Sequence, residues 1–410
     1  MRSIMINGFT GMNNVRDDSA MDENGMVTPR INLNADVTPD RSLKRRLGFQ
    51  KMVNLPNAHS LWANRKMMLC AAEGYLYRIY PDYSKVQVCA LAGPHDERLY
   101  YAEADGKIYI SSRHWMGVFD PMSNTVESWG IPLPVGPMLS AGSGSLKAGT
   151  YMVCFTATNN ATAYREISGN GEIAAITLGD NSGIVIQNRP AGAIVWCTDT
   201  NGDTFYLAGE VDSITAYPST EPLPTFMCQP PSPMRFIRLK FGRMWGSVGN
   251  RLYYTEPYRY GLVKSTNYFQ YPDEIQMVAA VEGGIYLGFS DRTLFLNGQT
   301  PQEMREMHAG EGVVRGAVYH VRSAIGDLGA NVPIWVAKNG IVAGSHTGQA
   351  VTLTKDRLQI APGEEGAAII RVVNGLTQFM ASVKQQRKRG SGVGFGDDAT
   401  CEIIRNGRII

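Results

Sequence analysis

The side chains that most often perform acid–base or metal chemistry are scattered along this sequence. Its six histidines are His59, His95, His114, His308, His320 and His346. None follows another by two or four residues, so no short segment offers paired imidazoles for a transition metal. The motifs HExxH, GxSxG and GxxxxGK(S/T) are also absent. The sequence therefore predicts no catalytic residue, no metal ligand and no cofactor, and we expect no enzyme. A metal site assembled from distant strands is the less favoured alternative.

One segment has some of the letters of a calcium-binding loop. Asp199, Asn201 and Asp203, followed by Glu210, match four positions of an EF-hand. Thr204 stands where that loop needs glycine, and the flanking segments alternate in polarity as strands do, whereas an EF-hand is flanked by helices. We therefore interpret the segment as the polar tip of a hairpin.

Two clusters of basic residues are candidate contacts for nucleic acid or for assembly with an acidic partner. The first consists of Arg41, Lys44, Arg45 and Arg46, and the second of Lys384, Arg387, Lys388 and Arg389. Such clusters bind a phosphate backbone or an acidic partner surface, or they are simply solvated loops. For the first cluster both interpretations stay open. The second precedes a glycine-rich run typical of a flexible loop, so we favour the solvated loop there.

Several tyrosines could stack on sugars or bases. They are Tyr100, Tyr101, Tyr253, Tyr254, Tyr258 and Tyr260. Tyrosines on alternating strands more often pack between neighbouring sheets. We therefore favour packing for this set.

Composition excludes several classes of protein. The chain has 410 residues, 44% of them hydrophobic, and a formal net charge of +2, so it has no global field that would attract nucleic acid or an acidic membrane. Its six cysteines are dispersed, which predicts free thiols. No signal peptide and no apolar run long enough to span a membrane is recognisable, so we expect a soluble protein made in a reducing cytoplasm.

A repeated hairpin is the strongest structural signal. The unit is a short apolar run, a turn ending near glycine and an alternating strand, and it recurs at 67–80, 98–111, 243–256, 276–289, 333–344 and 368–382. A second strand pair often follows, which gives four-stranded units of ~30–45 residues, the size of a propeller blade. The sequence predicts an all-β fold, a β-propeller of about six blades. One or two helical turns are expected only at 302–307.

The long interval between the second and third hairpins predicts an inserted domain. Residues 131–145 and 218–233 are rich in proline, glycine and serine and are interpreted as linkers. Between them, 146–217 has about seven period-two segments, which is typical of a fibronectin III or immunoglobulin-like β-sandwich. The expected domains are an extended N-terminal arm (1–50), propeller segments at 51–135 and 234–410, and the inserted sandwich at 146–217.

The N-terminal residues resemble a known family. Residues 8–18 read GFTGMNNVRDD, residues 31–37 read INLNADV and residues 42–49 read SLKRRLGF. This pattern is similar to the start of β-propeller structural tail proteins of tailed bacteriophages, of the nozzle, hub or tail-tip type and of short-tailed phages especially. Some members also carry a sandwich with strands like GTYMVCFT at 149–156. Thr10 departs from the family, where a second glycine is usual.

The resemblance implies a structural virion protein. It implies a homo-oligomeric ring, expected to be a hexamer, around the DNA ejection channel. Its partners would be other tail proteins on the adaptor or portal side and at the fibres or tip, with DNA passing transiently. The protein would be made in the bacterial cytoplasm and reside in the tail. The alternative is a virion-surface adhesin that binds a receptor or glycan, and a propeller hydrolase is disfavoured because no catalytic set is visible.

Overall fold

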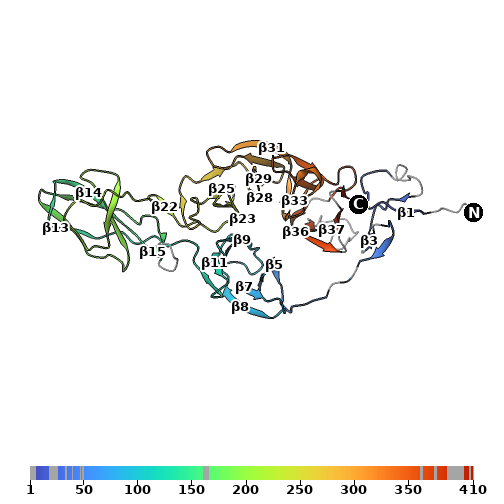
Figure 1. Cartoon of the computed structure of the whole chain (residues 1–410), viewed down its shortest axis with the longest axis horizontal. Coiled ribbons are helices and arrows are strands. Elements are labelled where there is room, and N and C mark those ends of the chain that lie inside the picture. The colour runs from blue at the N-terminus through green and yellow to red at the C-terminus, as the bar shows by residue number, and fades with distance from the viewer. Residues whose placement is uncertain are drawn as a thin grey trace, which may run out of the picture. The chain divides into compact units, whose positions relative to one another are not determined.

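The chain consists almost entirely of β-strands and turns (Figure 1). The structure is a computed structural model that describes residues 6–17, 26–32, 35–38, 40–46, 48, 50–159, 166–360, 363–373, 376–385, 401–405 and 408–409. These ranges contain one short 3-10 helix, η2 (Gly326–Leu328). They contain no helix that is long and apolar enough to cross a membrane. The prediction of an all-β chain is confirmed.

The chain folds as two compact units. One comprises Leu55–Val248 and Leu252–Gln270, and the other comprises the described parts of Met1–Asn54, Gly249–Arg251 and Tyr271–Ile410. We call them the central unit and the terminal unit.

Three four-stranded antiparallel sheets belong to the central unit. The first contains β5 (His59–Ala63), β6 (Met68–Ala72), β7 (Tyr75–Ile79) and β8 (Lys85–Ala90). The second contains β9 (Tyr100–Ala104), β10 (Lys107–Ser111), β11 (Met116–Asp120) and β12 (Thr125–Glu127). The third contains β23 (Arg235–Lys240), β24 (Arg243–Val248), β25 (Arg251–Tyr254) and β27 (Tyr268–Gln270). In each sheet the strands pair in the order in which they follow one another.

Two-residue turns set the register of these sheets. Asp105 and Gly106 join β9 to β10 with φ angles of 52° and 75°, so that Ala104 pairs with Lys107. Positive φ at both positions is the requirement of a type I′ turn, whose twist matches that of the strands. The turn between β6 and β7 has the same form. All six predicted hairpins are present as neighbouring strands.

Neighbouring sheets of the central unit are joined by buried contacts. Ser60, at a bulge in β5 with φ 54°, accepts a hydrogen bond at Oγ from the Leu99 N–H (2.9 Å). The Tyr101 hydroxyl donates to the Ser60 carbonyl oxygen (2.8 Å) and its ring stacks on Trp62. Leu76 and other buried apolar side chains of both sheets form one core. The first two sheets therefore stabilise each other through these hydrogen bonds and this core.

Residues 139–214 form two sheets packed face to face. One sheet has the order β13 (Leu139–Leu146), β18 (Ser182–Ile186), β21 (Ser213–Ile214). The other has the order β17 (Ala174–Leu178), β14 (Gly149–Thr156), β19 (Ile194–Thr198), β20 (Phe205–Gly209). Tyr151, Phe155, Ile184 and Val195 lie in the core that the two sheets share. The two sheets form a sandwich, and its membership of the fibronectin III or immunoglobulin class stays a prediction.

Parts of both predicted linkers belong to the sandwich or pack on it, which corrects their interpretation there. Residues 139–145 belong to β13. In the second segment, Leu223 and the Phe226 ring cover the outer face of β20, where the Leu223 N–H donates to the Phe205 carbonyl oxygen (2.9 Å). Glycine and serine in β13 permit close strand pairing, because a side chain at Gly144 would lie 2.5 Å from the Ser182 carbonyl oxygen.

Residues 168–171 tie both segments to the sandwich. The Thr225 hydroxyl donates to the Ser168 carbonyl oxygen (2.6 Å), and the Met227 N–H donates to the Asn170 side chain (2.8 Å). A Cβ at Gly169 would lie 1.7 Å from the Cys228 carbonyl oxygen, and one at Gly171 would lie 2.2 Å from the Pro134 carbonyl oxygen. Glycine is therefore required here by the close approach of the backbones.

The terminal unit contains one four-stranded sheet and one eight-stranded sheet. The first contains β28 (Met277–Val281), β29 (Gly284–Gly288), β30 (Arg292–Asn297) and β31 (Arg305–Glu311). The second has the order β35 (Ala350–Thr352), β34 (Gly340–Gly344), β33 (Val332–Ala337), β32 (Val313–Val321), β36 (Gly363–Val373), β37 (Leu376–Gln385), β38 (Cys401–Arg405), β39 (Arg408–Ile409). The helical turns expected at 302–307 are wrong, because from Arg305 onward this segment pairs with β30.

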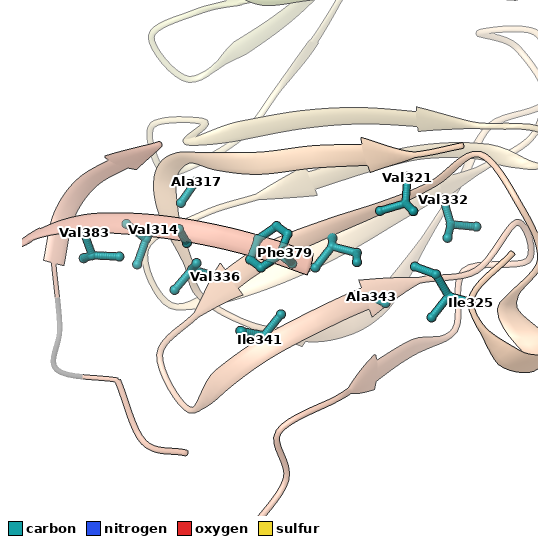
Figure 2. Packing of buried hydrophobic residues seen from close by; sticks show 12 residues of the cluster. Val314, Ala317, Val321, Ile325, Val332, Val336, Ile341, Ala343, Phe379 and Val383 are labelled. Carbon is teal, nitrogen blue, oxygen red and sulfur yellow. The ribbon is translucent and has the colours of Figure 1, made fainter. Parts of the chain in front are cut away.

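One core lies under β32, β33, β34 and β37 (Figure 2). Phe379 of β37 is fully buried among valine and isoleucine side chains, including Val336 and Ile341. Burial of these side chains stabilises the long β36–β37 hairpin on the sheet. The eight-stranded sheet is continuous because β32 pairs in parallel with β36.

We predict that Gly169→Ala destabilises the central unit. The added methyl group overlaps a backbone carbonyl that cannot rotate away, which should lower the free energy of unfolding by about 1–3 kcal/mol. Gly179→Ala is the control, because a Cβ there meets no atom within 4 Å. Urea denaturation followed by tryptophan fluorescence compares the two variants. Equal stability would contradict the packing described at Gly169.

We predict that Cys154 and Cys197 resist alkylation in the folded protein. They lie on adjacent strands but face opposite sides of the sheet, and both are free thiols. Burial raises the pKa of each to about 12, so almost no reactive thiolate exists at pH 8. Maleimide labelling with peptide mass mapping should modify both only after denaturation. Rapid labelling of either in the native protein would contradict this.

Candidate functional site

The first predicted basic cluster lies on a compact hairpin of the terminal unit. β3 (Ala35–Val37) pairs antiparallel with β4 (Leu43–Arg45), so the arm expected to be extended over 1–50 contains a folded hairpin. The turn is fixed by the Thr38 N–H and hydroxyl, which both donate to the Ser42 carbonyl oxygen (2.9 and 2.8 Å). Arg41 adopts a φ of 65° in this turn. Local hydrogen bonds of this kind can form without the help of a partner.

Arg46 anchors the hairpin within its own chain. Its Nε donates to Asp36 Oδ1 (2.9 Å), and its Nη2 lies 2.9 Å from the same oxygen. Arg371 of β36 approaches the other carboxylate oxygen of Asp36 through Nη2 (3.6 Å) and donates through Nε to Gln378 of β37. Asp36 thus joins β3 and β4 to the β36–β37 hairpin, whose other face packs on the core of Figure 2. Both side chains of the Arg46–Asp36 pair are mostly buried, so this contact is better protected from water than a surface pair.

Arg41, Lys44 and Arg45 have a different environment. All three are exposed, and the side chain of Arg41 contacts the Met26 sulfur (3.7 Å). Lys44 lies opposite Asp36, whereas Arg45 is on the other face of the hairpin because successive strand residues alternate. The structure therefore separates one structural arginine from three cations that are accessible to a partner. We call Arg41, Lys44 and Arg45, which lie in the turn and on both faces of the hairpin, the basic hairpin surface.

The asparagines of the N-terminal segment hold it to a distant part of the chain, a role that sequence reasoning missed. Asn14 donates from Nδ2 to the Gln359 carbonyl oxygen (2.9 Å) and accepts at Oδ1 from the Gln359 N–H (2.8 Å). Its own N–H donates to the Arg357 carbonyl oxygen (2.9 Å). Asn13 Oδ1 accepts from the N–H groups of Val15 and Arg16 (both 3.0 Å) and so fixes the turn. The side-chain amides of Asn13 and Asn14 therefore hold segment 8–16 to residues 356–359. We call these two residues the asparagine edge.

The second basic cluster is described only in part. Lys384 is exposed near the end of β37, in register with Glu365. It is six residues along the strand from Gln378, the partner of Arg371, which is about 20 Å. Arg387, Lys388 and Arg389 lie outside the described residues. The structure does not bring Lys384 into the basic hairpin surface.

Most of the candidate tyrosines pack in the central unit. Tyr100 lies on Phe236, Tyr253 on Tyr268, Tyr254 on Trp245, and Tyr260 against Tyr109, with ring centroids 4.8 to 5.6 Å apart. Tyr101 stacks on Trp62 of the first sheet, so Tyr100 and Tyr101 pack between sheets as expected, whereas the ring partners of Tyr253 and Tyr254 lie in their own sheet. Tyr258 is 80% exposed.

The segment that has some letters of a calcium-binding loop is a hairpin turn. Residues 199–204 form the turn between β19 and β20, as predicted for a polar hairpin tip, where the Asn201 N–H donates to the Thr150 carbonyl oxygen (2.8 Å). In the described parts of the chain, no three His, Cys, Asp or Glu side chains group as a metal would require. A small pocket beside Pro230 and Pro231 is lined by apolar side chains, Gln229, Ser232 and Tyr253.

No protein-family model and no curated protein sequence matches the chain. Among solved structures it is similar to the β-propeller domain of Cps50 (Swd1) from Myceliophteria thermophila, with a TM-score of 0.35 and 8% identity over 80% of this chain and 94% of that chain. It is also similar to the Pan2 WD40 domain of Neurospora crassa, with a TM-score of 0.33 and 11% identity over 79% and 85%. A streptogramin B lyase gives a TM-score of 0.34 and 12% identity over 79% and 90%. The chain is an all-β protein with a distant likeness to β-propellers.

We predict that Arg46 and Arg45 differ in their effect on stability. Arg46→Ala removes two charge-assisted contacts to a mostly buried carboxylate, which should lower the free energy of unfolding by about 1–2 kcal/mol. Arg45→Ala removes an exposed side chain and should change stability by less than about 0.5 kcal/mol. Urea denaturation followed by circular dichroism measures both. An equal loss in the two variants would contradict the division of the cluster.

Proposed function

We propose that the protein is a structural subunit of a bacteriophage tail, which assembles as a homo-oligomeric ring of the nozzle or hub type around the DNA ejection channel. The observation that carries the proposal is the N-terminal segment. The residues that resemble the tail-protein pattern form two defined structures, the asparagine edge at Asn13 and Asn14 and the hairpin that ends in Arg46. The role in the tail, the location in the virion and the expected hexamer rest on this resemblance.

The strand organisation supports the finer fold assignment. Six sets of four strands pair as antiparallel meanders: β5–β8, β9–β12, β23–β27 without β26, β28–β31, β32–β35 and β36–β39. We propose that each set is one blade of a six-bladed propeller, and that the sandwich at 139–214 is an immunoglobulin-like insertion. A closed propeller leaves few free sheet edges, which suits a component that must stay rigid and resist aggregation.

The exposed chemistry also suits assembly more than catalysis. The basic hairpin surface offers charged donors on a hydrogen-bonded turn, and most of the tyrosines that would serve an adhesin are engaged in packing contacts with other rings. We propose that the chain has no enzymatic activity and that its partners are copies of itself and other tail proteins. DNA would pass without being gripped, in keeping with the net charge of +2.

Labelling of particles tests this proposal. An antibody raised against the purified chain should mark the tails of phage particles released by the bacterium that carries the sequence, seen by electron microscopy. A glycan array with the purified protein should give no binding. Absence of the label from particles, or specific glycan binding together with labelled fibres, would overturn the proposal.

A further inference from the structure

Hydrogen bonds within the chain define the backbone conformation of the basic hairpin surface. The turn from Thr38 to Ser42 is closed by backbone and hydroxyl hydrogen bonds, and Arg46 fixes the hairpin base through Asp36. Its exposed cations therefore lose little conformational freedom in the backbone when they dock. Within the described residues, Arg45 forms no ion pair, so its charge is available to an acidic surface.

The chain carries an opposite charge elsewhere, on the sandwich. Residues 26–51 contain six lysines and arginines against two carboxylates. Residues 139–217 contain seven carboxylates against three cations. The near-neutral total of the chain thus conceals a basic segment in the terminal unit and an acidic domain in the central unit. Charge separation of this kind is common where two surfaces recognise each other.

Several of these carboxylates gather at one end of the sandwich. Asp180 accepts a hydrogen bond from the Ala148 N–H (2.8 Å) in the turn between β13 and β14. The tip of the β19–β20 hairpin lies at the same turn, because Asn201 Oδ1 accepts from the Thr150 N–H (2.9 Å). Asp199 and Asp203 flank Asn201 and are exposed.

Among the residues of the sandwich that the structure describes, little positive charge offsets them at this end. Lys147 is the cation of the adjoining turn, and Arg189, at the opposite end of β18, is paired with Asp212 (2.7 Å). We call Asp180, Asp199 and Asp203 the acidic sandwich end. Three exposed carboxylates here face solvent with one lysine beside them.

We infer that the basic hairpin surface of one copy docks on the acidic sandwich end of a second copy. The inference rests on the proposed function, a self-assembling ring, and names the contact that builds it. The two surfaces differ, so the contact is head to tail, and head-to-tail contacts generate closed rings when the rotation between copies allows it. DNA could bind the basic hairpin surface, but the carboxylates of the acidic sandwich end would repel it. Docking of a second copy accounts for both surfaces.

Charge exchange between the two surfaces tests the inference. Lys44→Glu with Arg45→Glu makes the hairpin variant, and Asp199→Lys with Asp203→Lys makes the sandwich variant. Each should weaken self-association of the full chain on the order of tenfold or more, because like charges then face each other. Arg65→Glu with Lys66→Glu is the matched control, an exposed arginine–lysine pair in the turn between β5 and β6, and should associate as the wild type does. Light scattering after size exclusion at low salt measures the masses.

Two further samples make the result decisive. An equimolar mixture of the hairpin and sandwich variants should recover oligomers in which the two variants alternate, because the native hairpin then meets the native sandwich end and the two exchanged surfaces also carry opposite charges. The chain with all four substitutions should recover the wild-type oligomer, since the exchanged charges attract again. Circular dichroism checks that each variant is folded.

Four outcomes overturn the inference while leaving the proposed function standing: a hairpin variant that still forms the wild-type oligomer, a mixture that stays monomeric, a quadruple variant that does not recover, or a hairpin variant that loses only binding to duplex DNA. A wild-type chain that is monomeric at every concentration would instead remove the proposed ring itself.

Discussion

A four-stranded sheet of five-residue strands cannot bury both of its faces alone, and this constraint organises the molecule. Each sheet depends on a neighbour for part of its core and for partners to its buried polar groups. In the central unit, the Tyr101 hydroxyl of the second sheet donates to the Ser60 carbonyl oxygen of the first sheet. The Ser111 hydroxyl of the second sheet accepts from the Met234 N–H (2.9 Å), just before the third sheet begins. The two sheets of the sandwich bury their inner faces against each other in one shared core.

The need of each sheet for a neighbour also explains which charged residues stabilise the fold. The β36–β37 hairpin buries Phe379 on one face and presents Arg371 on the other, and Arg371 shares Asp36 with Arg46. The Asp36 carboxylate lies between two guanidinium groups and holds the N-terminal hairpin against the sheet. It also occupies the Nε and Nη2 donors of Arg46, which are therefore not available to a partner. Arg41, Lys44 and Arg45 are left exposed. The cations that we propose for assembly are thus residues that the fold does not need.

Local signals made the fold partly predictable. Asp105-Gly106 and the alternating strands around it are sufficient for a type I′ hairpin. The six repeats were recognisable because each has a turn near glycine followed by an alternating strand. Residues 139–145 look like a linker because glycine and serine dominate both flexible segments and strands that pair too closely for side chains. Gln302 to Met307 contains good helix formers, but pairing with β30 outweighs their intrinsic preference.

The candidate site was less predictable, because its contacts join residues far apart in the sequence. Asp36 meets Arg371, and Asn14 meets Gln359, through separations that no local pattern encodes. The proposed function requires that this chain assembles with itself. Native mass spectrometry of the purified 410-residue chain tests this requirement most directly. We expect one closed species at a single integer multiple of 45.0 kDa, stable on dilution and weakened by salt. A lone 45.0 kDa species at all concentrations would contradict it.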